Sequence, residues 1–187
     1  IAFLLSKINK NLQQPNLYLI GFMGTGKSIA GEMAARNLDL LFVDSDKEIE
    51  RNEEQKISAI FEKSGEATFR KMEKDFILHG HPQSGYLVSC GGGLPVAEGM
   101  LDSLKERGLV VTLWASPETI YERTKSNSTR PLLQVPEPLA EIAKLLGARE
   151  STYLGADKVI STEQRSPKAV SELITRFYKE NMEERGN

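Results

Sequence analysis

The sequence predicts a three-layer α/β fold built on one parallel β-sheet, and three observations favour this class. Short apolar runs alternate with segments of helical periodicity along most of the 187 residues. Strands that alternate with helices pair in parallel through right-handed crossovers, which place helices on both faces of the sheet. Hydrophobic residues make up 40% and charged residues 27% of the chain, which suits one soluble globular domain.

The expected strands are five short apolar runs, which span residues 17–20, 40–43, 86–90, 109–115 and 158–160. Helical spacing follows each of the first two runs. Ser116-Pro117-Glu118 predicts a helix start with proline in the first turn, and the last helix begins near Ser166-Pro167. Residues 1–15 have no counterpart in this pattern, so we expect a peripheral extension before a domain of residues 16–187.

Residues 124–138 form the one long irregular stretch, with little apolar periodicity and prolines at positions 131, 136 and 138. Long loops without regular structure in compact domains commonly serve as active-site lids. We therefore expect a mobile lid here, and a surface insert without function is the alternative.

Charge and cysteine content restrict the partners and the compartment. The formal net charge of -2 provides no overall attraction for nucleic acid. No apolar run approaches the roughly 20 residues that a membrane span needs. The single cysteine, Cys90, excludes an intramolecular disulfide framework and suits a reducing compartment. We expect a cytoplasmic protein without nucleic-acid or membrane partners.

Residues 21–28, with the sequence GFMGTGKS, satisfy the pattern GxxxxGKS between a predicted strand and a predicted helix. Glycines let the backbone N–H groups point at phosphates, and the helix presents its positive end to the same anion. Lys27 adds a full charge near the β- and γ-phosphates, and Ser28 offers a hydroxyl oxygen to Mg²⁺. The predicted ATP-binding residues of this phosphate loop are Gly24, Thr25, Gly26, Lys27, Ser28 and Ile29. A glycine-rich turn with an incidental lysine is the alternative.

Several separated motifs follow the phosphate loop: Asp44-Ser45-Asp46, Gly65-Glu66-Ala67-Thr68-Phe69-Arg70, Gly91-Gly92-Gly93 and Arg130-Pro131-Leu132-Leu133. Together they resemble the shikimate kinase family over roughly residues 16 to 180. The resemblance implies transfer of the γ-phosphoryl group of ATP to the 3-hydroxyl of shikimate, giving 3-phosphoshikimate and ADP, a step toward chorismate and the aromatic amino acids. It also implies Mg²⁺, a P-loop fold with strand order 2-3-1-4-5, and a monomer.

The pair Asp44 and Asp46 is expected at the mouth of a strand, where alternation would point both carboxylates the same way with Ser45 opposite. By resemblance, Asp44 would hold Mg²⁺ together with Ser28. Asp46 would orient or deprotonate the substrate hydroxyl, and Lys27 and Arg130 would complete the catalytic set. Helix N-capping is the alternative for such acidic residues.

Arg70 and Arg149 would clamp the substrate carboxylate, which a planar guanidinium can bind through two parallel hydrogen bonds. The alternative for Arg70 is a salt bridge to Glu66 or Glu73 at helical spacing. Backbone without Cβ atoms at Gly91, Gly92 and Gly93 would lie against the substrate, with the Gly92 N–H as a donor. A plain flexible turn is the alternative there.

Arg123 would stack on adenine, and Arg130 would reach the phosphates on lid closure. Pro167 falls near the adenine-contacting loop of the family, although a helix start explains a proline equally well. Ile29 departs from the family, which usually has Thr there. Two rival functions remain: a kinase for gluconate or a nucleotide, which would need a different clamp, and a noncatalytic nucleotide-binding regulator of the same fold.

Overall fold

The computed structural model describes residues 14–125 and 135–185 and contains one five-stranded parallel sheet. The strands are β1 (Asn16–Ile20), β2 (Leu41–Asp44), β3 (Tyr86–Ser89), β4 (Gly108–Trp114) and β5 (Lys158–Ser161). Their order, β2-β3-β1-β4-β5, confirms the expected order, and every neighbouring pair is parallel. All five predicted strands are present, with ends that differ by at most one residue.

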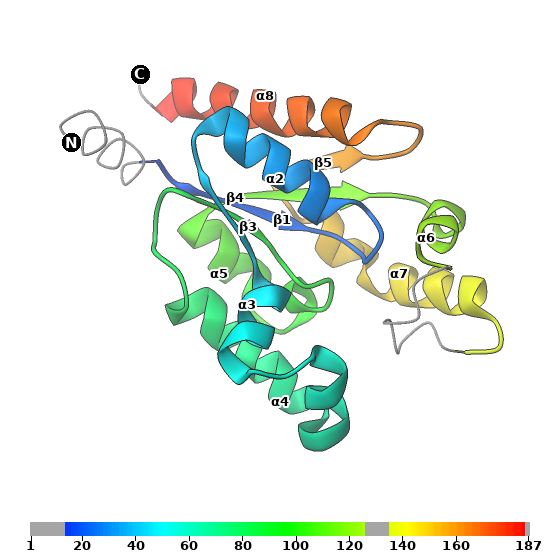
Figure 1. The fold of residues 1–187 in the computed structure, drawn as a ribbon. Coiled ribbons are helices and arrows are strands. Elements are labelled where there is room, and N and C mark those ends of the chain that lie inside the picture. Colours follow the sequence, from blue (N-terminus) through cyan, green and yellow to red (C-terminus); the bar gives the residue numbers. More distant parts are fainter. Residues whose placement is uncertain (1–13, 126–134, 186–187) are drawn as a thin grey trace.

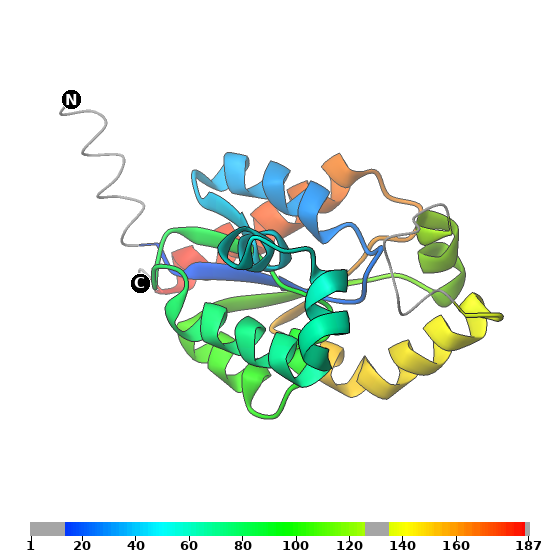
Figure 2. The same ribbon diagram turned by 60° about the horizontal axis from the view of Figure 1, so that its bottom comes forward.

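Helices cover both faces of this sheet. They are α2 (Lys27–Leu38), α3 (Ser45–Glu53), α4 (Ile57–His79), α5 (Met100–Arg107), α6 (Pro117–Thr124), α7 (Pro138–Leu154) and α8 (Pro167–Arg185), with a short 3₁₀ turn η1 (Leu94–Val96). Figures 1 and 2 show α2 and α8 on one face and α4, α5 and α7 on the other. The three-layer prediction is confirmed.

The central strand β1 explains why both faces are covered. All five of its residues are buried, and successive side chains point to opposite faces. Leu17 and Leu19 belong to the core shared with α2 and α8, whereas Tyr18 and Ile20 belong to the core shared with α4, α5 and α7. Burial on both faces requires an apolar run, and this run was the sequence signal for the strand.

Helix α4 contains a break at Gly65, whose φ of 76° and ψ of 167° are not helical. This region of φ favours glycine, because an L side chain there would be strained. The break separates a first segment from the longer one that carries Arg70. The sequence prediction of Arg70 on a helix after a turn is therefore confirmed.

Two expected segments lie partly outside the described residues. The proposed extension of residues 1–15 is described from Gln14 onward, and the proposed lid is described at residues 124–125 and 135–138. Helix α6 ends at Thr124 and α7 begins at Pro138, so regular helices flank the interval predicted as the lid. Within the described ranges, no helix combines the length and apolar character needed to cross a membrane.

Candidate active site

The predicted site residues gather at the carboxyl ends of three adjacent strands. The phosphate loop follows β1, Asp44 ends β2, and the triple glycine follows β3. These strands are neighbours in the order β2-β3-β1, so the segments that follow them lie at the same end of the sheet (Figure 2). Ligands of open α/β sheets bind at this end.

The phosphate loop is held by its own polar groups. Thr25 Oγ1 donates to Phe22 O at 2.8 Å, and Lys27 Nζ donates to Gly21 O at 2.7 Å and Phe22 O at 2.9 Å. Gly24 and Gly26 have φ of 77° and 89°, which other residues rarely adopt. The loop therefore curves around the Lys27 ammonium group and leads directly into α2, whose first residue is Lys27.

The first residues of α2 meet the end of β2 through a pair of hard oxygen atoms. Ser28 Oγ donates to Asp44 Oδ2 at 2.7 Å. Mg²⁺ prefers such oxygens and usually keeps several waters, so a hydroxyl and one carboxylate beside bound phosphates fit this ion. No group of three or more His, Cys, Asp and Glu side chains arranged to hold a metal occurs among the described residues.

The expected strand geometry of Asp44 and Asp46 is wrong, because β2 ends at Asp44 and α3 begins at Ser45. Asp44 is the N-cap of α3, and its side chain accepts a hydrogen bond from Lys47 N. The capping alternative is thus correct for Asp44, without excluding its contact to Ser28. Asp46 lies in the first helical turn, where an acidic side chain is stabilised by the helix dipole.

Asp46 lies beside the triple glycine. A Cβ atom on Gly91 would lie 2.6 Å from Asp46 Oδ1 and 2.2 Å from Glu73 Oε1. Two carboxyl groups therefore approach one backbone point. Glycine is required at position 91 because any side chain would displace them.

Arg70 is paired with both acidic neighbours on its own helix. Its Nη2 donates to Glu66 Oε1 at 2.8 Å, and its Nη1 donates to Glu73 Oε2 at 2.6 Å. The salt-bridge alternative is thus present in the structure. The guanidinium also lies against the triple glycine Gly91-Gly92-Gly93, the glycine loop, because a Cβ atom on Gly93 would be 2.3 Å from Arg70 Nη1.

Glu73 is the ionisable residue whose importance the sequence analysis missed. It is 1% exposed, and its Oε1 has no hydrogen-bond partner. Burial raises the pKa of Glu73 from 4.5 to about 7, an effect that Arg70 opposes and the charge of Asp46 strengthens. The signal was a glutamate three residues after Arg70, which had suggested only a surface pair.

The glycine loop is fixed from two sides. Gly91 N donates to the buried hydroxyl of Ser45 at 3.0 Å, and Gly92 O accepts from Tyr153 Oη at 2.7 Å. A Cβ atom on Gly92 would lie 3.3 Å from Gly21 O of the phosphate loop. The triple glycine is therefore held in one position between the predicted ATP site and the predicted shikimate site. These contacts argue against a plain flexible turn.

Arg149 projects from α7 to the same region. Its guanidinium lies 5.5 Å from the ring centre of Phe22, in the phosphate loop. Burial raises the pKa of both Glu73 and Tyr153, and the charges of Arg149 and Arg70 oppose this rise at each of the two groups. The two arginines of the predicted clamp thus surround one set of side chains, although they are 79 positions apart in the sequence.

Of the two residues predicted to contact adenine, Arg123 lies beside the phosphate loop. Arg123 Nη1 donates to Gly24 O at 3.3 Å and to Thr162 Oγ1 at 2.9 Å, and its Nη2 donates to Thr162 O at 3.0 Å. Thr162 follows β5 and was not predicted. Pro167 is the first residue of α8, and Ser166 Oγ accepts from Ala169 N, so the capping explanation holds for this proline.

Two further predicted residues stand apart. Ile29 follows Ser28 on α2 and is 62% exposed, an uncommon setting for a large apolar side chain. Arg130 lies outside the described residues, and its expected contact with phosphate remains a prediction.

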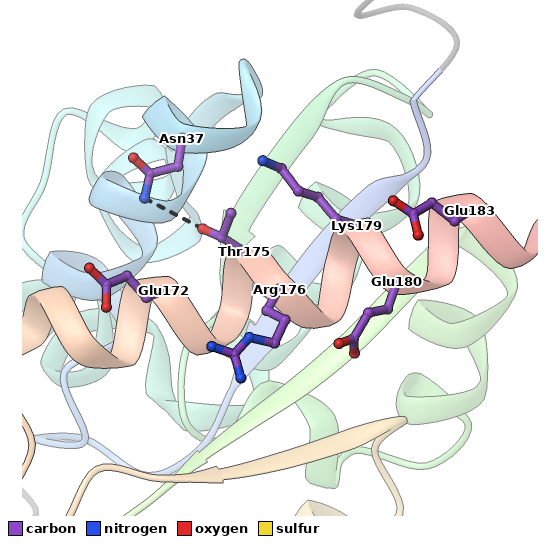
Figure 3. Close-up of a pocket in the computed structure, with 7 residues that line it drawn as sticks. All are labelled: Asn37, Glu172, Thr175, Arg176, Lys179, Glu180 and Glu183. Atoms are coloured by element: carbon purple, nitrogen blue, oxygen red, sulfur yellow. Dashed lines mark hydrogen bonds between the residues drawn. The ribbon is translucent and has the colours of Figure 1, made fainter.

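A hollow of about 390 Å³ lies elsewhere, along the outer surface of α8 and the end of α2 (Figure 3). It is lined by Asn37, Glu172, Thr175, Arg176, Lys179, Glu180 and Glu183. Asn37 is ten residues beyond Lys27 on α2, about 15 Å along the helix. The hollow is therefore remote from the phosphate loop and contains none of the predicted site residues.

Comparison with known proteins adds an independent line of evidence. The shikimate kinase family model matches residues 23–179. A shikimate kinase from Thermodesulfovibrio yellowstonii is 40% identical over 163 residues, which cover 87% of this chain and 94% of the relative.

Solved structures separate the family from the wider fold. The shikimate kinase from Acinetobacter baumannii in complex with shikimate has a TM-score of 0.86 and 35% identity, covering 90% of this chain and 95% of that chain. A gluconokinase from Sinorhizobium meliloti 1021 has a TM-score of 0.61 and 16% identity, covering 92% of this chain and 98% of that chain, and shows the shared fold alone. The family model matched over residues 23–179, together with the 40% identity to a shikimate kinase over 87% of the chain, shows that this chain belongs to the shikimate kinase family.

Proposed function

We propose that this protein phosphorylates the 3-hydroxyl of shikimate with ATP, giving 3-phosphoshikimate and ADP. The observation that carries the proposal is the convergence of Asp46, Arg70 and Arg149 around the glycine loop, next to the phosphate loop. An acceptor here would have its hydroxyl near a carboxylate and its own carboxylate near two guanidinium groups. Shikimate carries both functional groups.

Charge stabilisation and positioning account for the chemistry of phosphoryl transfer. Lys27 and the N–H groups at the start of α2 would hold the phosphates, and Lys27 would exchange its contacts with Gly21 O and Phe22 O for the ligand. Asp46 would accept the hydrogen bond, and finally the proton, of the attacking hydroxyl. Arg130, within the predicted lid, would neutralise charge on the transferring group.

Ser28 and Asp44 would hold Mg²⁺, which supplies charge neutralisation at the phosphate oxygens when bound. The hydrogen bond between these side chains keeps both oxygens at the entrance of the phosphate loop. Arg123 and Pro167 would bound the adenine site. We also propose a cytoplasmic protein, for which a free and buried Cys90 is the supporting observation. By resemblance to the family, we propose a monomer.

The test is ADP release from Mg-ATP with and without shikimate, with gluconate and a nucleoside monophosphate as alternative acceptors. We expect strong stimulation by shikimate alone. Stimulation by gluconate or the nucleotide instead would transfer the assignment to that acceptor. ATP binding without stimulation by any acceptor would favour a noncatalytic regulator.

A further inference from the structure

Tyr153 joins helix α7 to the glycine loop. The side chain is 1% exposed, and its hydroxyl donates to Gly92 O at 2.7 Å. A buried tyrosine hydroxyl normally needs a polar partner, and here that partner is the backbone of the predicted substrate site. The tyrosine backbone is fixed as well, because Thr112 Oγ1 of β4 donates to Tyr153 O at 2.6 Å. Tyr153 is therefore anchored at both ends.

The hydroxyl bond sets the orientation of one peptide plane. The chain has no cis peptide bond in its described parts, and in a trans peptide the C=O and the following N–H point in opposite directions. Because Gly92 C=O points to α7, the Gly93 N–H points away from α7. Glycines allow many backbone conformations, so this plane needs an external contact to stay in one orientation.

The remaining polar groups of the loop show which donors are available to a ligand. Gly91 N donates to Ser45 Oγ, Gly91 O accepts from Leu94 N, and Gly93 O accepts from Val96 N. Within the described parts of the chain, the N–H groups of Gly92 and Gly93 form no hydrogen bond. Successive N–H groups of this kind form favourable sites for anionic oxygens.

The same tyrosine lies one helical turn after Arg149 on α7. Residues four apart share a helix face. Burial raises the pKa of the Tyr153 hydroxyl, and the charges of Arg149 and Arg70 oppose this rise, so both guanidinium groups lie within electrostatic range of it. The Tyr153 hydroxyl thus lies near both arginines and the two donor amides. The two guanidinium groups and the two N–H groups are all suited to binding one carboxylate.

We propose that Tyr153 is a positioning residue for the substrate carboxylate: its hydroxyl holds the Gly92–Gly93 peptide so that the loop N–H groups and Arg149 act on the same anion. The inference rests on the proposed function, because it takes shikimate as the ligand.

The first measurement compares Tyr153→Phe with the wild type by titration calorimetry of shikimate and by steady-state kinetics. Loss of this one hydroxyl should weaken shikimate binding and raise its KM roughly fivefold to tenfold, with the KM for ATP unchanged. The matched control is Tyr178→Phe on α8. This variant also removes the hydroxyl of a buried tyrosine, which donates to the backbone carbonyl of Pro15 at 2.7 Å. The control should lose stability and keep both KM values.

The methyl ester of shikimate identifies the group on which Tyr153 acts. Tyr153→Phe should weaken the acid more than the ester, because the amide donors and Arg149 serve the carboxylate. Equal losses for both ligands, or an unchanged dissociation constant for shikimate in a folded Tyr153→Phe protein, would overturn the proposal. If shikimate neither bound to the wild type nor stimulated its release of ADP, the proposed function would be contradicted, and the inference with it.

Amide NMR of the wild type gives a test that needs no variant. Shikimate should shift the Gly92 and Gly93 amide resonances and slow their hydrogen exchange. Unaffected amides at saturating shikimate would overturn the proposal even if Tyr153→Phe failed to fold.

Discussion

Asp46 lies in the first turn of α3, with one carboxylate oxygen directed at the Gly91 backbone. We expect Asp46→Asn to lower kcat by about 100-fold or more, because the amide cannot accept the proton of the attacking hydroxyl. ATP affinity should stay near normal, since the phosphate loop and Lys27 are unchanged. The measurement is ADP release together with ATP titration.

The control for this variant is Asp75→Asn, which removes a charge from an exposed position of α4. It should leave turnover within the error of the assay. Near-normal turnover in Asp46→Asn would remove this carboxylate from the reaction.

Arg70 combines a half-buried guanidinium with contacts to Glu66 and Glu73. Arg70→Ala should weaken shikimate by about 30-fold or more and leave ATP almost unaffected, since losing a partner of a buried charge costs about 2 to 5 kcal/mol. Separate titrations with the two ligands check this. Arg36→Ala is the matched control, because Arg36 forms the same i, i−4 pair with Glu32 on an exposed face. Equal weakening of both ligands in Arg70→Ala would indicate a structural arginine.

The glycine loop after β3 predicts whether an added methyl group lowers activity or stability. In Gly91→Ala the new Cβ meets the ends of two side chains, Asp46 and Glu73, which can shift. We expect a fold that persists and a kcat that falls by about tenfold or more, because the displaced groups belong to the substrate site. Thermal unfolding and steady-state kinetics of the same preparation measure the two effects.

Two other glycines provide the contrast. In Gly108→Ala the Cβ would lie 2.1 Å from the backbone oxygen of Asn16 on β1, so stability should fall because the strand pair itself must separate. Gly147→Ala in α7 meets nothing within 4 Å and should raise the free energy of unfolding by up to about 1 kcal/mol. A larger stability loss in Gly91→Ala than in Gly108→Ala would contradict this division.

The strands and most helices were predictable because their signals are local. Runs such as residues 17–20 are apolar on both faces, and Gly26 and Gly65 mark backbone that other residues rarely adopt. The start of α3 was mispredicted because Asp44 both ends β2 and caps the helix, so one residue carries both signals. Local alternation could not reveal that the strand had already ended.

The contacts within the site depend on distances between segments far apart in the chain, which a single sequence does not encode visibly. The bonds from Ser45 to Gly91, from Tyr153 to Gly92 and from Arg123 to Thr162 each span more than 35 positions. Motif resemblance had indicated one partner in each pair as a ligand contact. It could not indicate the second, whose function is to hold the first.

Burial of Glu73 makes the stability of the whole molecule depend on pH. The folded pKa of about 7 lies above the ordinary 4.5, so the folded state binds the proton more tightly than the unfolded state. The resulting stabilisation is complete below pH 4.5 and is lost as pH rises through 7. Over this window it amounts to about 3 kcal/mol.

Chemical denaturation of the wild type and of Glu73→Gln at several pH values isolates this contribution. The glutamine variant should lack the loss of stability between pH 4.5 and 7. His81 contributes with the opposite sign, because burial lowers its pKa and stability falls as pH drops below 6.5, but this effect is common to both proteins. Parallel pH curves for the two proteins would show that folding does not raise the pKa of Glu73.

The burial of Cys90 has a practical consequence for labelling chemistry. The sequence has one cysteine, whose side chain is 1% exposed and whose pKa is raised by burial, so it should react slowly with maleimides. A cysteine introduced at Lys179, in the hollow along α8, would then be the dominant reactive thiol of the native protein. A fluorophore attached there would lie far from the phosphate loop, so ligand binding could be followed by anisotropy or energy transfer without altering a binding residue.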